Sequence, residues 1–106
     1  MFYNEQIAFL EANDVDGLIS NHYNTDAALI GFDFTVQGHE ALRQQFQNYL
    51  RGLGHFRLRE TTRFNEIENA IFFEATITGD QGDLRIYDAM VLKNGKISLH
   101  FTGVRD

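Results

Sequence analysis

The stretch "DLRIYDAMVLKNGKI", residues 83–97, decides the fold and raises the question of the site. From Leu84 to Leu92 every second side chain except that at position 88 is apolar, which predicts a strand with one buried face. "NG" at 94–95 then predicts a tight hairpin turn into the last strand. Asp88 falls on the buried face of this strand. A carboxyl group there indicates either hydrogen-bonding partners in the core or contact with a ligand.

The period of two continues through the second half of the chain. It predicts four strands joined by hairpins, over residues 55–67, 69–80, 82–93 and 96–106. On such a strand His100, which lies between Leu99 and Phe101, would point outward, and only a β-bulge would turn it inward.

Helical periodicity dominates the first half of the chain. Apolar residues recur every three or four positions over residues 4–12, 15–23 and 36–54, which predicts three helices. Between the second and third helices, residues 23–34 turn into a strand, and Leu29 and Asp33 share one of its faces. Helices followed by a meander of long strands predict an α+β fold, with the helices packed on one face of a curved, mostly antiparallel sheet.

Composition narrows the class of protein. The chain has 106 residues, which fits a single domain over residues 1–106. It has no cysteine, which excludes disulfides and thiolate metal sites and fits a reducing compartment. The net charge of −6 argues against nucleic acid as a partner. With no apolar run long enough for a membrane span and no signal-peptide pattern, we expect a cytoplasmic protein without a membrane partner.

Motifs for metals, cofactors and common hydrolytic chemistry are missing from the sequence. The histidines, at positions 22, 39, 55 and 100, do not have the spacing of metal ligands, and no Ser-His-Asp arrangement or phosphate-binding glycine loop occurs. We therefore expect no metal and no cofactor.

Three pieces of the chain resemble a known family when taken in order. They are "LISNHYNTDAAL" (18–29), "VQGHEALRQQF" (36–46) and "LRIYDAMVLKNGKI" (84–97). Together they resemble the SnoaL-like branch of the nuclear-transport-factor-2-like (NTF2-like) superfamily, which includes ketosteroid isomerases and polyketide cyclases. The resemblance implies one SnoaL-like domain, a cone-shaped α+β barrel of the cystatin-like kind with an apolar pocket at its open end.

The resemblance also implies a homodimer that forms through the outer face of the sheet. Phe, Tyr and Val side chains on that face are easier to explain in a dimer than in a monomer. The residues expected there are Arg57, Arg59, Phe72, Tyr87, Ala89 and Val91.

The resemblance to ketosteroid isomerases implies roles for individual residues. Asp88 matches the aspartate that donates a hydrogen bond to the developing oxyanion, and its apolar surroundings resist ionisation. Gly31 occupies the position that the catalytic base has in ketosteroid isomerases. Asp33, two residues later, could act as the base in its place. The position of the helical tyrosine falls on Ile7, so steroid isomerisation is not expected. The candidate catalytic residues are Asp88 and Asp33, and the expected pocket residues are Tyr23, Leu29, Phe46, Tyr49, Phe73, Ile86, Met90 and Phe101.

Such a pocket suits a small apolar molecule with a carbonyl or hydroxyl group. The protein would bind it, and as an isomerase or cyclase it would move a proton at the carbon beside the carbonyl. The alternatives are a non-catalytic ligand carrier and a dimerisation or protein-interaction module. The sequence does not decide among these, because the same fold hosts all three.

Overall fold

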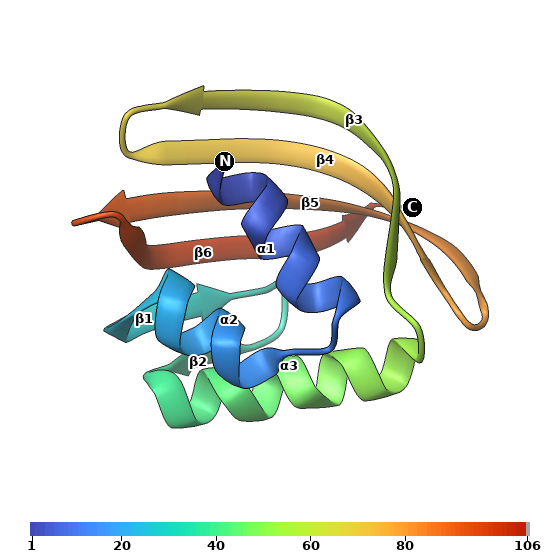
Figure 1. The fold of residues 1–106 in the computed structure, drawn as a ribbon, viewed down its shortest axis with the longest axis horizontal. Coiled ribbons are helices and arrows are strands. Elements are labelled where there is room, and N and C mark those ends of the chain that lie inside the picture. The colour runs from blue at the N-terminus through green and yellow to red at the C-terminus, as the bar shows by residue number, and fades with distance from the viewer. Residues whose placement is uncertain (106) are drawn as a thin grey trace.

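The computed structural model describes residues 1–105, and it has three helices packed on a sheet of six strands (Figure 1). In chain order the elements are α1 (Phe2–Glu11), α2 (Val15–His22), β1 (Tyr23–Ile30), β2 (Thr35–Gln37), α3 (His39–Leu53), β3 (Arg57–Ile67), β4 (Ala70–Gly79), β5 (Gly82–Lys93) and β6 (Lys96–Arg105). The α+β prediction is confirmed, with N-terminal helices and a C-terminal meander. Of the last expected strand, Asp106 lies outside the described residues. No helix within residues 1–105 is both long and apolar enough to cross a membrane.

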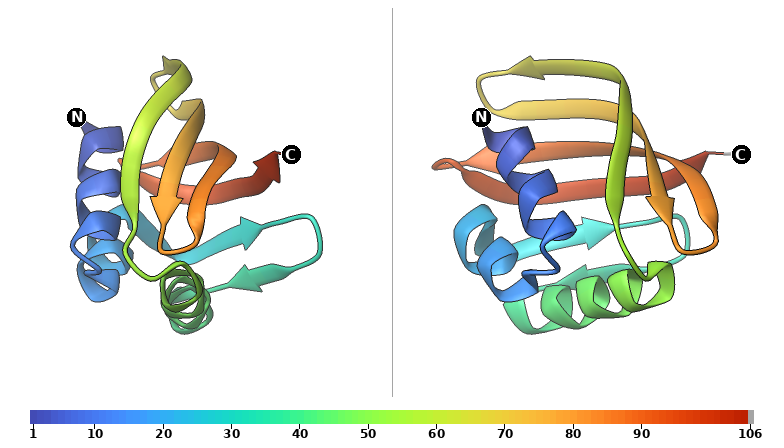
Figure 2. Two further views of the ribbon diagram at one scale, coloured as in Figure 1. Left: turned by 90° about the vertical axis from the view of Figure 1, so that its right-hand side faces the viewer. Right: turned by 45° about the vertical axis from the view of Figure 1, so that its right-hand side comes forward.

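The strands lie in the order β2-β1-β6-β5-β4-β3, and neighbours are antiparallel except for β1 and β6, which are parallel. This pairing joins the first strand of the chain to the last. The sheet curves around the helices, with α3 lying along its open side (Figure 2). The helices therefore lie on the concave side of the sheet.

A short strand that the sequence did not reveal precedes the third helix. Thr35–Gln37 pairs with the end of β1, so α3 begins at His39 and not at position 36. Three residues are too few to show a period of two, which is why the pattern was missed.

The turn between β1 and β2 corrects the expected position of Asp33. β1 ends at Ile30, and the Gly31 N–H then donates to the Phe34 carbonyl at 2.9 Å, which closes a tight turn. Asp33 is exposed in this turn and does not lie on a strand face. Its expected alignment with Leu29 along one strand is wrong.

A β-bulge in β6 sets which residues of that strand face inward. Val91 pairs with Leu99 and Leu92 with Ile97, so Ser98 has no partner of its own on β5. The extra residue reverses the alternation, and both Ile97 and His100 are buried.

The same bulge turns Phe101 outward, where 42% of it is exposed. The expectation that Phe101 lines the pocket is therefore wrong. The β-bulge that would turn His100 inward is present, and His100 is buried.

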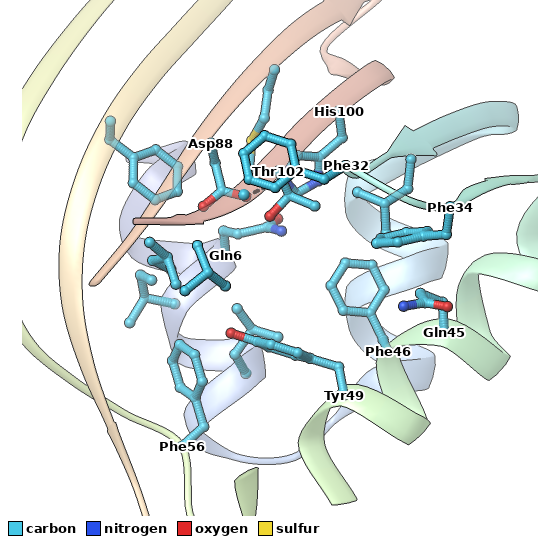
Figure 3. Close-up of a pocket in the computed structure, with 18 of the residues that line it drawn as sticks. Gln6, Phe32, Phe34, Gln45, Phe46, Tyr49, Phe56, Asp88, His100 and Thr102 are labelled. Carbon is cyan, nitrogen blue, oxygen red and sulfur yellow. Dashed lines mark hydrogen bonds and ion pairs between the residues drawn. The ribbon is translucent and has the colours of Figure 1, made fainter. Parts of the chain in front are cut away.

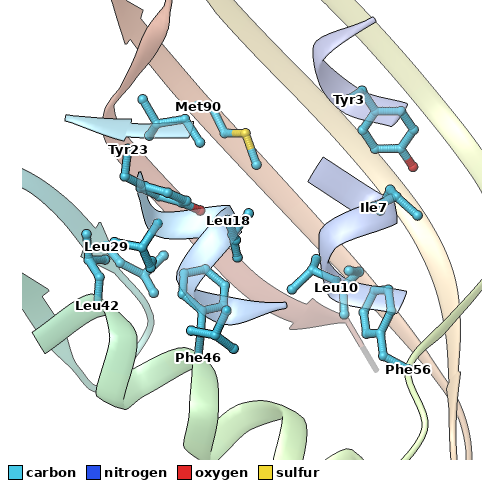
Figure 4. Close-up of a cluster of buried hydrophobic side chains, with 14 of the residues drawn as sticks. Tyr3, Ile7, Leu10, Leu18, Tyr23, Leu29, Leu42, Phe46, Phe56 and Met90 are labelled. Atoms are coloured by element: carbon cyan, nitrogen blue, oxygen red, sulfur yellow. The ribbon is translucent and has the colours of Figure 1, made fainter. Parts of the chain in front are cut away.

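The core lies between the helices and the inner face of the sheet (Figure 4). Each helix contributes the apolar stripe that its sequence shows, β4 and β5 contribute every second residue, and β6 contributes Ile97. The largest fully buried apolar side chains are Leu18, Ile19, Tyr23, Leu42, Ile77 and Ile97.

We expect Leu42→Ala in α3 to lower the free energy of unfolding by about 2–5 kcal/mol, because it removes a fully buried side chain from this core. Gln47→Ala on the exposed side of the same helix is the control and should change it by less than about 0.5 kcal/mol. Urea unfolding of both variants measures the difference. Equal losses would show that α3 is not anchored through Leu42.

Candidate functional site

A cavity of about 240 Å³ lies within the core, between α1, α3 and the inner face of the sheet (Figure 3). Most of its wall is apolar. The apolar lining includes Leu10, Leu29, Phe46, Phe56, Phe73, Ile86 and Met90, and the polar lining consists of Gln6, Asp33, Gln45, Tyr49, Asp88, His100 and Thr102. The cavity thus resembles a ligand pocket, with few polar groups in apolar surroundings.

The structure brings most of the expected site residues to this cavity. Asp88 and Asp33 both line it, as do the expected pocket residues Leu29, Phe46, Tyr49, Phe73, Ile86 and Met90. Tyr23 does not line it and lies behind the wall, completely buried. Phe101 lies on the outer face of the sheet.

Asp88 is held on the cavity wall by the strand register. It stands between Phe73 of β4 and Thr102 of β6, and it is 5% exposed. Its Oδ1 atom lies 2.7 Å from Nε2 of His100, which is also buried. The sheet thus supplies the partner that a buried carboxyl group requires.

Behind His100 the hydrogen bonds continue toward the helices. His100 Nδ1 lies 2.8 Å from the Tyr23 hydroxyl, which also accepts from Gln6 Nε2 at 3.1 Å. Gln6 Oε1 in turn lies 2.7 Å from Nδ1 of His22. Within residues 1–105, no fully buried side-chain nitrogen or oxygen is left without a partner.

Tyr49 faces Asp88 across the cavity (Figure 3). Burial, together with the negative charge of Asp88, raises the pKa of its hydroxyl well above the usual range, so the phenol stays protonated. No residue among 1–105 forms a hydrogen bond with this hydroxyl. It is therefore free to donate to a molecule in the cavity.

The rim of the cavity is built by the turn after β1 and by α3. Asp33 and Gln45 lie there, beside Phe32, which is 77% exposed. The Asp33 carboxylate therefore lies at the rim, in contact with solvent, whereas the Asp88 carboxylate lies in the interior of the cavity.

The cavity does not have the composition of a metal site. Within residues 1–105, no three His, Cys, Asp or Glu side chains come together as metal ligands would. Asp88 has His100 as its neighbour, and Asp33 is the other acid on the wall.

Sequence reasoning missed Gln6, His100 and Thr102 as members of the site. Gln6 could have been found, because it lies on the helical stripe formed by Tyr3, Ile7 and Leu10. The position of His100 depends on the bulge, for which the sequence around Ser98 has no clear signal.

Solved structures share this architecture. A candidate isomerase of the SnoaL-like family from Agrobacterium tumefaciens aligns with 99% of this chain and 95% of its own, with a TM-score of 0.82 and 12% identity. A candidate polyketide cyclase from Sinorhizobium meliloti aligns with 95% of this chain and 92% of its own, with a TM-score of 0.81 and 16% identity. The chain has the NTF2-like fold.

A third similar structure of this fold contains a small molecule. It is a protein with a ketosteroid isomerase-like fold from Catenulispora acidiphila in complex with trimethylamine, with a TM-score of 0.80 and 10% identity, covering 95% of this chain and 82% of its own. The sequence matches no family model, and no curated protein is significantly similar to it. At these identities the likeness shows the fold and leaves the function to the site itself.

We expect the free energy of unfolding to fall between pH 7 and pH 5.5 because of His22. Burial lowers the pKa of His22 below its usual value of about 6.5 and outweighs the Glu5 carboxylate, which raises it. Below about pH 6.5 the unfolded chain therefore binds the proton more readily than the folded chain does, and stability declines. Urea unfolding at the two pH values measures the change.

His22→Gln is the matched control for this pH effect. It keeps a hydrogen-bonding side chain beside Gln6 but removes the titrating ring, so the loss between pH 7 and pH 5.5 should shrink. An unchanged loss in this variant would assign the effect to another group.

Proposed function

We propose that the protein binds a small, largely apolar molecule with a carbonyl or hydroxyl group in the cavity, and that it moves a proton at the carbon beside the carbonyl. The observation that carries this proposal is the pairing of Asp88, held by His100, with the unpartnered hydroxyl of Tyr49 across an apolar cavity. Trimethylamine in the Catenulispora structure supports small-molecule binding by proteins of this fold.

Asp88 is the group best placed to take the proton. His100 holds its Oδ1, which leaves Oδ2 for a ligand, and the apolar wall keeps water away from the reaction. As Oδ2 takes a proton from the carbon, the electron pair of the C–H bond moves toward the carbonyl oxygen. Asp88 then returns the proton to the same carbon or, where the enolate is conjugated with a further double bond, to the far carbon of that double bond.

Tyr49 is the group best placed to stabilise the enolate oxygen. Its phenol stays protonated and donates a hydrogen bond where negative charge develops. These roles differ from the expected ones, in which Asp33 takes the proton and Asp88 donates to the oxygen. Asp33 is exposed in a turn at the rim, where solvent competes for it.

Hydrogen–deuterium exchange into 2-tetralone tests the proposal without knowledge of the natural ligand. In D2O the protein should speed the incorporation of deuterium beside the carbonyl, which NMR measures. We expect Asp88→Asn to lower this rate by about 100-fold or more, because it removes the proton acceptor. Tyr49→Phe should cost about 100-fold, because it removes the donor to the oxygen.

Asp33→Asn serves as the control and should keep the exchange rate. The melting temperature of each variant shows whether it is folded. Binding of 2-tetralone without enhanced exchange would identify the protein as a ligand carrier instead. A wild-type rate equal to that of Asp88→Asn would rule out catalysis by Asp88.

The outer face of the sheet supports a homodimer as part of the same proposal. Two cross-strand rows lie side by side there, Phe72–Ala89–Phe101 and Ala70–Val91–Leu99. More than a third of each of Phe72, Val91, Leu99 and Phe101 is exposed. Charged residues such as Glu74, Arg85 and Arg105 border the patch. An apolar centre with a polar rim on one face is suited to a two-fold contact with a second copy of the chain.

We expect Phe72→Glu or Phe101→Glu to convert the dimer into monomers, because either change buries an unpaired charge in the contact. Sedimentation velocity measures the oligomeric state. Asn48→Glu adds the same charge to an exposed position on α3 and should leave the dimer intact. A monomeric wild-type protein at the same concentration would overturn the dimer.

A further inference from the structure

Five buried side chains, three of which line the cavity, form one continuous hydrogen-bonded chain. They are His22, Gln6, Tyr23, His100 and Asp88, each 5% exposed or less, and they come from α2, α1, β1, β6 and β5. The elements are distant in sequence, but the hydrogen bonds connect them directly. Because each of these side chains is almost completely buried, the direction of the hydrogen-bonded chain is set by the protein groups that they contact.

Gln6 has a fixed donor end and a fixed acceptor end. Its Oε1 can only accept, so the contact of 2.7 Å requires a proton on Nδ1 of His22. Its Nε2 can only donate, and it donates to the oxygen of Tyr23. An imidazole or a hydroxyl can exchange these roles by moving a proton, whereas an amide can do so only by turning over.

The direction set at Gln6 passes through Tyr23 and His100. Gln6 Nε2 can only donate to the Tyr23 hydroxyl, and the other hydrogen-bond partner of that hydroxyl is Nδ1 of His100, 2.8 Å away, so the hydroxyl proton points to Nδ1. His100 then carries its proton on Nε2 and donates it to Oδ1 of Asp88 at 2.7 Å. A donated hydrogen bond favours the ionised form of a carboxyl group. Asp88, the last member of the hydrogen-bonded chain, therefore accepts a hydrogen bond from His100.

Glu5 favours the opposite direction. Its Oε1 lies 3.3 Å from Nε2 of His22 and would attract a proton there. This side chain is 65% exposed and free to turn to solvent, so its pull is weak. The bond between Nδ1 of His22 and Gln6 is shorter and buried. Phe2 stacks on the His22 ring with centroids 3.9 Å apart, which holds the ring plane in place.

We propose that Gln6 is the positioning residue that sets the direction of this chain and so keeps Asp88 ready to accept a proton from a ligand. The inference rests on the proposed function for its consequence, but its geometry stands without a ligand. In the reversed chain, Tyr23 would donate to Gln6 and Nδ1 of His100 would donate to Tyr23. Nε2 of His100 would then need a proton from Asp88, which could no longer act as the base.

The direct test is the tautomer of each ring in the wild-type protein. Two-dimensional 1H–15N NMR of protein labelled at its histidines distinguishes a protonated from an unprotonated ring nitrogen. At neutral pH, we expect His100 to be protonated on Nε2 only and Nδ1 of His22 to carry a proton. A proton on Nδ1 of His100 would overturn the proposal, and this measurement needs no variant.

Gln6→Glu tests whether position 6 sets the direction. Both oxygens of an ionised glutamate accept, so Tyr23 should turn its proton toward Glu and Nδ1 of His100 should gain one. The exchange rate with 2-tetralone should then fall by about tenfold or more, as it does when the partner that orients a catalytic group is lost. Gln47→Glu makes the same chemical change on the exposed side of α3, outside both the cavity and the hydrogen-bonded chain, and should alter neither the His100 spectrum nor the rate.

The two readouts separate this inference from the proposed function. If the tautomers are as expected but the wild-type protein gives no exchange, the chain direction stands and the catalytic proposal fails. If exchange occurs and His100 carries its proton on Nδ1, catalysis stands and the role of Gln6 fails. An unchanged His100 spectrum in folded Gln6→Glu would also overturn that role.

Discussion

The hydrogen bond between His100 and Asp88 allows a carboxyl group to lie on a sheet face that otherwise packs apolar side chains. Without this partner, Asp88 would carry the full cost of desolvation. The bond depends on the bulge at Ser98, because a regular β6 would turn His100 outward. One extra residue in one strand therefore determines whether the inner face can hold a polar group.

The cavity and the core are made from the same residues. Leu29, Phe46 and Met90 pack against neighbouring side chains on one side and line the open space on the other. An unfilled space forgoes the packing energy that a filled core would supply. The polar side chains behind the wall are all hydrogen-bonded, so the fold adds no unsatisfied buried group to that cost. Natural proteins accept such losses where a site needs room.

The parts of the fold that could be predicted are those in which one hydrophobic periodicity continues over many residues. The alternation in β4 and β5 and the stripe of α3 span ten or more residues each, and they gave the elements and the inward direction of Asp88. The failures are local. β2 has three residues, Asp33 sits in a turn closed by a backbone hydrogen bond, and Phe101 follows a bulge. Each of these depends on backbone geometry that side-chain patterning does not encode.

The parallel pairing of β1 with β6 has a consequence for folding. The contact between Tyr23 and His100 joins residues separated by 77 positions, so it closes a large loop. Contacts of this kind form late, since the loss of chain entropy precedes the gain from packing. On the ribosome, α1 and α2 are made long before β6, and their buried side chains must wait for it. The hydrogen-bonded chain from His22 to Asp88 is therefore completed only when the two halves of the polypeptide meet.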